Sequence, residues 1–488
     1  MLRLRFSTQL IIVIALGICA VILYYPILSW SFWKDDWWFL YGSYSLDKKF
    51  LTNILQPGTV LQFLIEWPIF LTSPLPYMSI GIGLKTLYAY VLGIFVSKLI
   101  SKNVQIMVSL LALLLPIGLD AVGWPSAHVT LVSGILLMVG TTVICSSIKH
   151  KLLGFFCFGI ACFLDPGRSI LVILFNLVFL YKKNKISKTS MITIASSVGM
   201  VITLILIYMH QYLSQFQIIK FINSIFAGSS HFNLMHIVSF ARNYFSSLSN
   251  LFLGFLISKP HYLSSAIVSN KDFTEGITVC FLIAILCVIA YRKKQDTVPI
   301  YALCWISISY ITPWLFEPRI SQSIYHRYMV IPGIGLYILL AWILNSIRSR
   351  YIRNLCLIAL LCIGGFHSIR FLQSQSELRQ HARTIELYSH LISEEKKYRS
   401  PIIFYLIGSD ILIPGAISFA ENMPISVLTH RIDNSTLPQI AIVPEHIKKY
   451  VCNTNGSTIY TVLSIDVNTG IDIRTRSVEL LSSSLCDK

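Results

Sequence analysis

Two adjacent carboxylates, Asp35 and Asp36, lie among four tryptophans just beyond the first long apolar run of the sequence. An acidic side chain near lipid loses hydration unless it has a partner or a chemical task. One carboxylate held in such a setting could remove a proton from a hydroxyl group as a general base. The alternative is an interfacial belt, in which tryptophans anchor at the headgroups and the acids face water. The neighbours Lys34, Trp37 and Trp38 are candidate substrate contacts.

Cationic and aromatic side chains gather in the segment 317–328, Glu-Pro-Arg-Ile-Ser-Gln-Ser-Ile-Tyr-His-Arg-Tyr. Guanidinium groups bind phosphate through charge-assisted hydrogen bonds, so this segment is a candidate phosphate site. Pairing of an arginine with Glu317 is the structural alternative. The candidate phosphate ligands are Arg319, His326 and Arg327, and the candidate substrate contacts beside them are Tyr325 and Tyr328.

A third candidate pair, Asp165 and Arg168, lies three residues apart in an Asp-Pro-Gly-Arg break between apolar runs. Asp165 could serve in catalysis and Arg168 could bind a phosphate, or the two could form a salt bridge across their own turn. Glu66, in Leu-Ile-Glu-Trp-Pro, is a further candidate substrate contact on an expected interfacial helix.

Metal ligands are weakly indicated. No two histidines have the H-x-x-x-H spacing of a helical zinc site. The remaining candidates are more typical of polar loop groups than of ligands; they are Asp120, His128, His231, His236 and His261. Carboxylate oxygens suit Mg²⁺ or Mn²⁺, so a divalent cation at Asp35 and Asp36 stays open, and no other cofactor is indicated.

The composition places these residues in a membrane protein. Of 488 residues, 55% are hydrophobic and 12% are charged, and the mean hydropathy is +0.68. Apolar runs of roughly 20 residues recur, each long enough to cross a bilayer as a helix. The net charge of +17 is spread over short basic clusters between these runs. Such clusters are topology signals, and their distribution argues against a nucleic-acid partner.

Positive charge follows every even-numbered apolar run, after about residues 97, 147, 181, 291 and 347. This regularity predicts about eleven transmembrane helices, with the amino terminus in the cytoplasm and the carboxyl terminus outside. The stretch 152–181 is too long for one crossing, so two short helices should meet at the Asp-Pro-Gly-Arg break near the outer face. The polar outer segments should be the loops 29–77, 120–128 and 211–275 and the tail. All three candidate clusters then lie on the outer side.

The domain organisation follows from this topology. Residues 1–372 should form an all-α polytopic bundle, and residues 373–488 a small extracytoplasmic α/β domain with β-rich runs at 401–407 and 457–464. Cys452 and Cys486 fall in this domain, where they could form a disulfide or remain two thiols.

A single helix followed by an outer loop that opens with an acidic pair beside aromatics resembles the polyprenyl-phosphate-dependent, multi-spanning (GT-C type) membrane glycosyltransferases. The chain length and the Lys-Asp-Asp-Trp context are most similar to the phage-borne, serotype-converting O-antigen glucosyltransferases of enteric bacteria. The resemblance implies an inverting hexosyltransferase of the bacterial inner membrane. It would move one glucose from an undecaprenyl-phosphate donor to a lipid-linked O-antigen on the periplasmic face, with Asp35 or Asp36 as the base.

Other classes remain as alternatives. A lipid-glycan flippase or transporter would also have many helices, but it usually shows repeated halves and polar residues near the bilayer midplane. This sequence instead concentrates charge at outer loops and shows no duplicated half. An O-antigen polymerase or ligase would depend more on arginine and histidine in outer loops. The sequence has no Walker loop, no G-x-S-x-G elbow and no dinucleotide fingerprint, so activation must arrive with the substrate.

Overall fold

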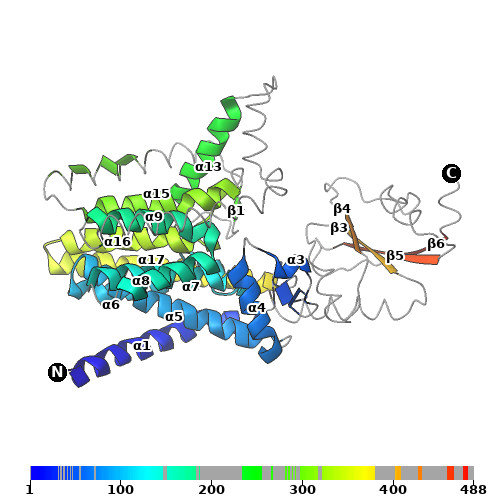
Figure 1. Cartoon of the computed structure of the whole chain (residues 1–488), viewed down its shortest axis with the longest axis horizontal. Coiled ribbons are helices and arrows are strands. Elements are labelled where there is room, and N and C mark those ends of the chain that lie inside the picture. Colours follow the sequence, from blue (N-terminus) through cyan, green and yellow to red (C-terminus); the bar gives the residue numbers. More distant parts are fainter. Residues whose placement is uncertain are drawn as a thin grey trace. The chain divides into compact units, whose positions relative to one another are not determined.

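In the computed structural model the chain divides into two compact units (Figure 1). The first comprises Met1–Leu28, Thr52–Gln62 and Leu75–Glu377, and the second Ser29–Leu51, Phe63–Pro74 and Leu378–Lys488. The described residues are 2–30, 32, 36, 39–40, 42–43, 46, 48–53, 56–70, 73–146, 151–182, 186, 234–254, 265–266, 278, 281–282, 284–285, 288–289, 292, 297–316, 321–379, 402–407, 427–430, 459–466 and 476–481.

The first unit is a helical bundle. In Figure 1, α7, α8, α9, α15 and α16 run roughly side by side. Helices suit a membrane because they satisfy their own backbone hydrogen bonds. The bundle helices are α1 (Leu2–Tyr24), α5 (Pro74–Leu99), α6 (Gln105–Leu114), α7 (His128–Ser146), α8 (Lys151–Leu164), α9 (Pro166–Lys182), α13 (Leu234–Leu253), α15 (Val298–Phe316), α16 (Val330–Ser346) and α17 (Arg350–Arg379), while α4 (Pro57–Phe70) passes from this unit into the other.

Six helical spans are long and apolar enough to cross a membrane within the described ranges. They are Gln9–Ser29, Pro74–Leu99, Pro125–Cys145, Val298–Leu315, Arg327–Ser346 and Arg350–Ser376. Two further apolar helices, Lys102–Leu114 and Lys151–Leu164, are shorter. Residues 187–233 and most of 267–296 lie outside the described part of the chain. The count of about eleven crossings therefore stays a prediction.

The helix break predicted within residues 152–181 is confirmed. The 14-residue α8 ends at Leu164, and the 17-residue α9 begins at Pro166. A proline has no N–H to donate and favours the first position of a helix, which is why a new helix starts there. The Asp165 N–H donates to Ala161 O at 3.0 Å, and Asp165 O accepts from the Ser169 N–H at 3.0 Å. Asp165 thus joins the two helices.

The polar segment 120–128, predicted as a short outer loop, is buried within the first unit. All residues from 115 to 130 are buried, and Asp120 and His128 are 0% and 1% exposed. The segment consists of the short 3₁₀ helices η3 (Leu119–Ala121) and η4 (Pro125–Ala127) with turns around them. Its burial is possible because its backbone N–H groups find carbonyl partners on a distant segment.

That distant segment, residues 321–329, connects α15 with α16. It contains β2 (Ser321–Gln322), which pairs antiparallel with β1 (Ser265–Ala266), and the 3₁₀ helix η6 (Arg327–Met329). Its carbonyls at Ile324 and Tyr325 accept the N–H groups of Gly118 and Asp120, both at 2.9 Å. The helix α13 also packs on β2. This 20-residue helix lies within the stretch 211–275, for which the sequence indicated only a loop.

The second unit contains a four-stranded mixed sheet in the order β4-β3-β5-β6. The strand β3 (Ile402–Ile407) is parallel to β4 (Val427–His430) and β5 (Ile459–Asp466), and β6 (Arg476–Leu481) is antiparallel to β5. The strands predicted at 401–407 and 457–464 coincide with β3 and β5. Helices of this domain lie outside the described residues, so its α/β class stays a prediction. The expected boundary at 372/373 falls inside α17.

Candidate functional site

A cavity of about 300 Å³ lies in the first unit, where residues from several helix ends meet. Four of the residues predicted as site residues contribute to its wall: Asp165, Arg168, Arg327 and Tyr328. The full lining consists of Gln56, Thr59, Ser126, Val129, Leu164, Asp165, Gly167, Arg168, Pro313, Arg327 and Tyr328. The turn between α8 and α9 and the segment 321–329, predicted separately, thus meet at one place.

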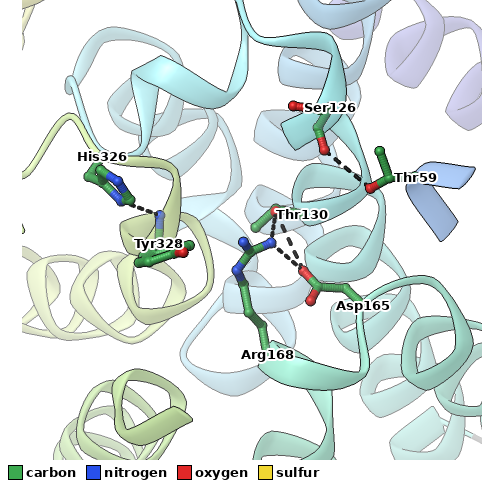
Figure 2. Close-up of polar contacts among 7 residues, drawn as sticks. All are labelled: Thr59, Ser126, Thr130, Asp165, Arg168, His326 and Tyr328. Carbon is green, nitrogen blue, oxygen red and sulfur yellow. Dashed lines mark hydrogen bonds and ion pairs between the residues drawn. The ribbon is translucent and has the colours of Figure 1, made fainter. Parts of the chain in front are cut away.

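Asp165 forms a salt bridge with Arg168 in the cavity wall. Arg168 Nη1 lies 2.7 Å from Asp165 Oδ2, and their side chains are 16% and 7% exposed. The same Nη1 donates to the hydroxyl of Thr130, which also donates to Asp165 Oδ2 at 3.4 Å. Figure 2 shows this three-residue cluster. The salt bridge weighed from the sequence therefore forms, and it fixes one edge of the Arg168 guanidinium.

Two guanidinium groups share the ring of Tyr328. The Arg168 guanidinium carbon is 4.8 Å from the ring centroid, and that of Arg327 is 5.7 Å away. Arg327 also lies 4.1 Å over the ring of Trp124, on the buried segment that precedes α7. Stacking on aromatic faces holds a guanidinium in place without using its hydrogen-bond donors. With Asp165 included, the cavity wall carries one net positive charge, which suits a monoanionic group.

His326 positions the turn that carries these groups. Its Nδ1 accepts a hydrogen bond from the backbone N–H of Tyr328 at 3.1 Å, and its ring is 8% exposed (Figure 2). His326 therefore caps η6. It is not part of the cavity lining, so its predicted contact with a phosphate stays a prediction. Tyr325 likewise lies apart from the lining, because its ring stacks on Phe371 of α17 at 4.6 Å.

Other predicted site residues belong to the second unit or lie outside the described residues. Asp36 and Glu66 are in the second unit, where Asp36 is fully buried and Glu66 is half-buried in α4. The aromatic side chains of Phe39, Phe50 and Phe63 pack together in the same unit, with ring centroids 5.4 and 5.9 Å apart. The predicted residues outside the described part are Lys34, Asp35, Trp37, Trp38, Arg319, Cys452, Cys486, His231 and His261, and the side chain of His236 is not described either.

Metal binding finds no further support in the described ranges, which contain no group of three or more His, Cys, Asp or Glu side chains that could hold an ion. Asp35 is outside those ranges, so a divalent cation at the acidic pair stays a prediction. Asp120 and His128, which the sequence suggested were loop groups, are buried, and His128 Nε2 lies 3.2 Å from Val122 O.

The sequence analysis missed three residues that build the site. Thr59 of α4 lines the cavity and donates to Ser126 O at 3.3 Å, as Figure 2 shows. Thr130 completes the Asp165 cluster, and Trp124 supports Arg327. No pattern in the sequence marked the two threonines. Trp124 stood in an apparent outer loop, and a tryptophan there reads equally well as an interfacial anchor.

The chain matches no protein-family model, and no curated protein sequence is significantly similar to it. Its structure is similar to the crystal structure of ArnT from Cupriavidus metallidurans in the apo state, with a TM-score of 0.50 and 12% sequence identity. The match covers 99% of this chain and 100% of the ArnT chain. At this identity the likeness concerns the fold, and the two chains share that fold over their full lengths.

Proposed function

We propose that this protein is a membrane glycosyltransferase of the GT-C type whose donor is a sugar linked to undecaprenyl phosphate. The observation that carries the proposal is the cavity in which Arg168 and Arg327 approach one tyrosine ring, within the fold of ArnT. The polyprenyl-phosphate-dependent membrane glycosyltransferases that the sequence resembles would use such a donor. A basic cavity in such a fold suits the phosphate of a lipid-linked donor.

The chemistry follows from the charge of that phosphate. A phosphodiester between lipid and sugar carries one negative charge, which matches the net charge of the cavity wall. As the bond between the anomeric carbon and the phosphate oxygen breaks, charge develops on the leaving lipid phosphate. Arg168 and Arg327 would stabilise it through charge-assisted hydrogen bonds. Asp165, held in its salt bridge, orients Arg168.

The base in this proposal is Asp35 or Asp36, an assignment that rests on the sequence pattern. Its carboxylate takes the proton of the acceptor hydroxyl as the hydroxyl oxygen bonds to the anomeric carbon. Attack opposite the departing phosphate inverts the configuration at that carbon. The resemblance of the Lys-Asp-Asp-Trp segment supports glucose as the sugar and a lipid-linked O-antigen on the periplasmic face as the acceptor.

The test replaces Asp35 and Asp36 singly with Asn in cells that make undecaprenyl-phosphate glucose and a lipid-linked O-antigen. Membrane abundance is measured for each variant, and glucosylation is read by mass spectrometry of the glycan. One variant should lose at least about 99% of the modification, since a general base contributes about 10²–10⁴ in rate. Lys98→Gln, an exposed change on α5, is the control. Full modification in both Asp variants contradicts the mechanism.

A further inference from the structure

Lys85 is a buried cation in the middle of a membrane-spanning helix. It lies in α5, is 1% exposed, and is the sole charged residue of the apolar run 78–97. No carboxylate of the described part of the chain lies within ion-pair distance of it. A lysine at the centre of a membrane helix is costly to remove from water, so its presence needs a compensating interaction.

The compensating interaction lies at the end of α6, which stops inside the bundle at Leu114. Lys85 Nζ lies 3.4 Å from Ile117 O, and 5.6 Å from the ring centroid of Tyr88 on the same helix. The hydroxyl of Tyr24 donates to Leu113 O, and Ser368 Oγ donates to Leu114 O at 2.7 Å. Side chains from α1 and α17 therefore supply donors to the last two carbonyls of α6, and α5 supplies one to Ile117, three residues beyond the helix.

The physical logic of this arrangement is that of a helix cap. The last carbonyls of a helix lack partners within it, and the helix dipole makes that end partly negative. At membrane depth, non-helical backbone is tolerated only where the protein satisfies it. Tyr24 and Ser368 satisfy the last carbonyls of α6, and Lys85 donates to Ile117 O in the non-helical backbone that follows.

The capped end leads directly to the donor cavity. The next residues, Gly118 and Asp120, donate their N–H groups to the segment 321–329, and Gly118 adopts a φ of +63° where a Cβ would meet Val330. The same buried segment carries Trp124, which lies under Arg327, and a cavity-lining residue, Ser126. The position of Arg327 thus depends on where the segment 115–127 is held.

We propose that Lys85 is a positioning residue, which donates to Ile117 O just beyond the end of α6 and so holds the segment 115–127 in register with residues 321–329 and Arg327 at the cavity. The link to donor binding rests on the proposed function. The anchoring of the segment 115–127 by Lys85 stands by itself, since it follows from contacts within the bundle. Lys85 acts through Arg327 and does not line the cavity.

The first experiment measures amide hydrogen exchange by mass spectrometry in purified full-length protein. Lys85→Met keeps an apolar stem and removes the charge, and Lys98→Met on the exposed end of α5 is the matched control. Exchange at peptides covering 115–127 should rise about tenfold in Lys85→Met alone, as a lost buried hydrogen bond of a charged group predicts. Exchange equal to the wild type overturns the anchoring of the segment 115–127 by Lys85. Lys85→Gln keeps a hydrogen-bond donor and replaces Lys85→Met if the latter does not assemble. Its amide exchange at 115–127 should rise about threefold, and the absence of a rise overturns the role of Lys85 equally.

The second experiment is a double-mutant cycle on transfer kinetics. Lys85→Met should raise the donor KM about tenfold while kcat stays within about twofold, and Lys85→Met combined with Arg327→Ala should match Arg327→Ala alone. Effects on KM that multiply in the double variant overturn the action through Arg327. A wild-type protein without transfer activity contradicts the proposed function, and the exchange measurement then still decides the role of Lys85.

Discussion

Replacing Asp165 with alanine should destabilise the protein, because it leaves the Arg168 guanidinium partly buried without its counter-charge. At the observed Nη1–Oδ2 distance of 2.7 Å, the Coulomb attraction is about 6 kcal/mol at an effective dielectric constant of about 20. Loss of hydration offsets part of this, and removing one partner of a buried pair costs about 3–5 kcal/mol. Since the two side chains retain 7% and 16% exposure, we expect a loss near the lower end, about 3 kcal/mol.

The assay is the free energy of unfolding from SDS titration in mixed micelles, for wild type, Asp165→Ala, Arg168→Met and the double variant. The double variant removes both charges and should recover most of the loss seen in Asp165→Ala. In transfer kinetics, Asp165→Asn should lower kcat less than about tenfold, whereas loss of a general base would lower it at least about a hundredfold. Additive losses in the double variant, or a hundredfold fall in kcat for Asp165→Asn, would refute the positioning role of Asp165.

Three further predictions follow from buried contacts of the bundle. Tyr301→Phe removes the 2.8 Å hydrogen bond to Asn176 Oδ1 that joins α15 to α9, and it should cost about 1 kcal/mol in the same SDS titration. Gly81→Ala places a Cβ against the Val122 carbonyl oxygen and should cost about 1–3 kcal/mol, with a fall in Tm as the readout. Asn250→Leu removes two hydrogen bonds, of 3.0 and 3.1 Å, from α13 to β2. The donor KM should rise about tenfold at near-constant kcat. An unchanged KM would show that α13 does not affect the site.

Local chemistry explains which parts of the fold were predictable. The break at Asp165 was readable because proline and glycine end helices by their own backbone geometry, whatever surrounds them. The candidate cations Arg168 and Arg327 were readable because arginine is unexpected outside the cytoplasmic loops. Their proximity at one cavity depends on the tertiary fold, because 159 positions of sequence separate them.

The remaining features depend on contacts that no local pattern encodes. The segment around Asp120 is polar and contains glycine and proline, which favours a loop. It is buried because its backbone bonds to carbonyls more than 200 residues later in the sequence. Lys85 leaves a signal in the sequence, a lone charge within an apolar run. The helix α13 has neither a long apolar run nor clear capping residues that would predict it.

The central claim is that the cavity of Arg168 and Arg327 binds the phosphate of a polyprenyl lipid, and direct binding tests it. Undecaprenyl phosphate is titrated against purified wild-type protein, Arg168→Met, Arg327→Met and the control Arg348→Met, an exposed change after α16, with undecaprenol as the uncharged competitor. Each cavity variant should weaken the Kd at least about tenfold, the loss of one charge-assisted hydrogen bond, while undecaprenol competes weakly. Equal affinity in all four proteins, or equal competition by undecaprenol, would contradict the claim.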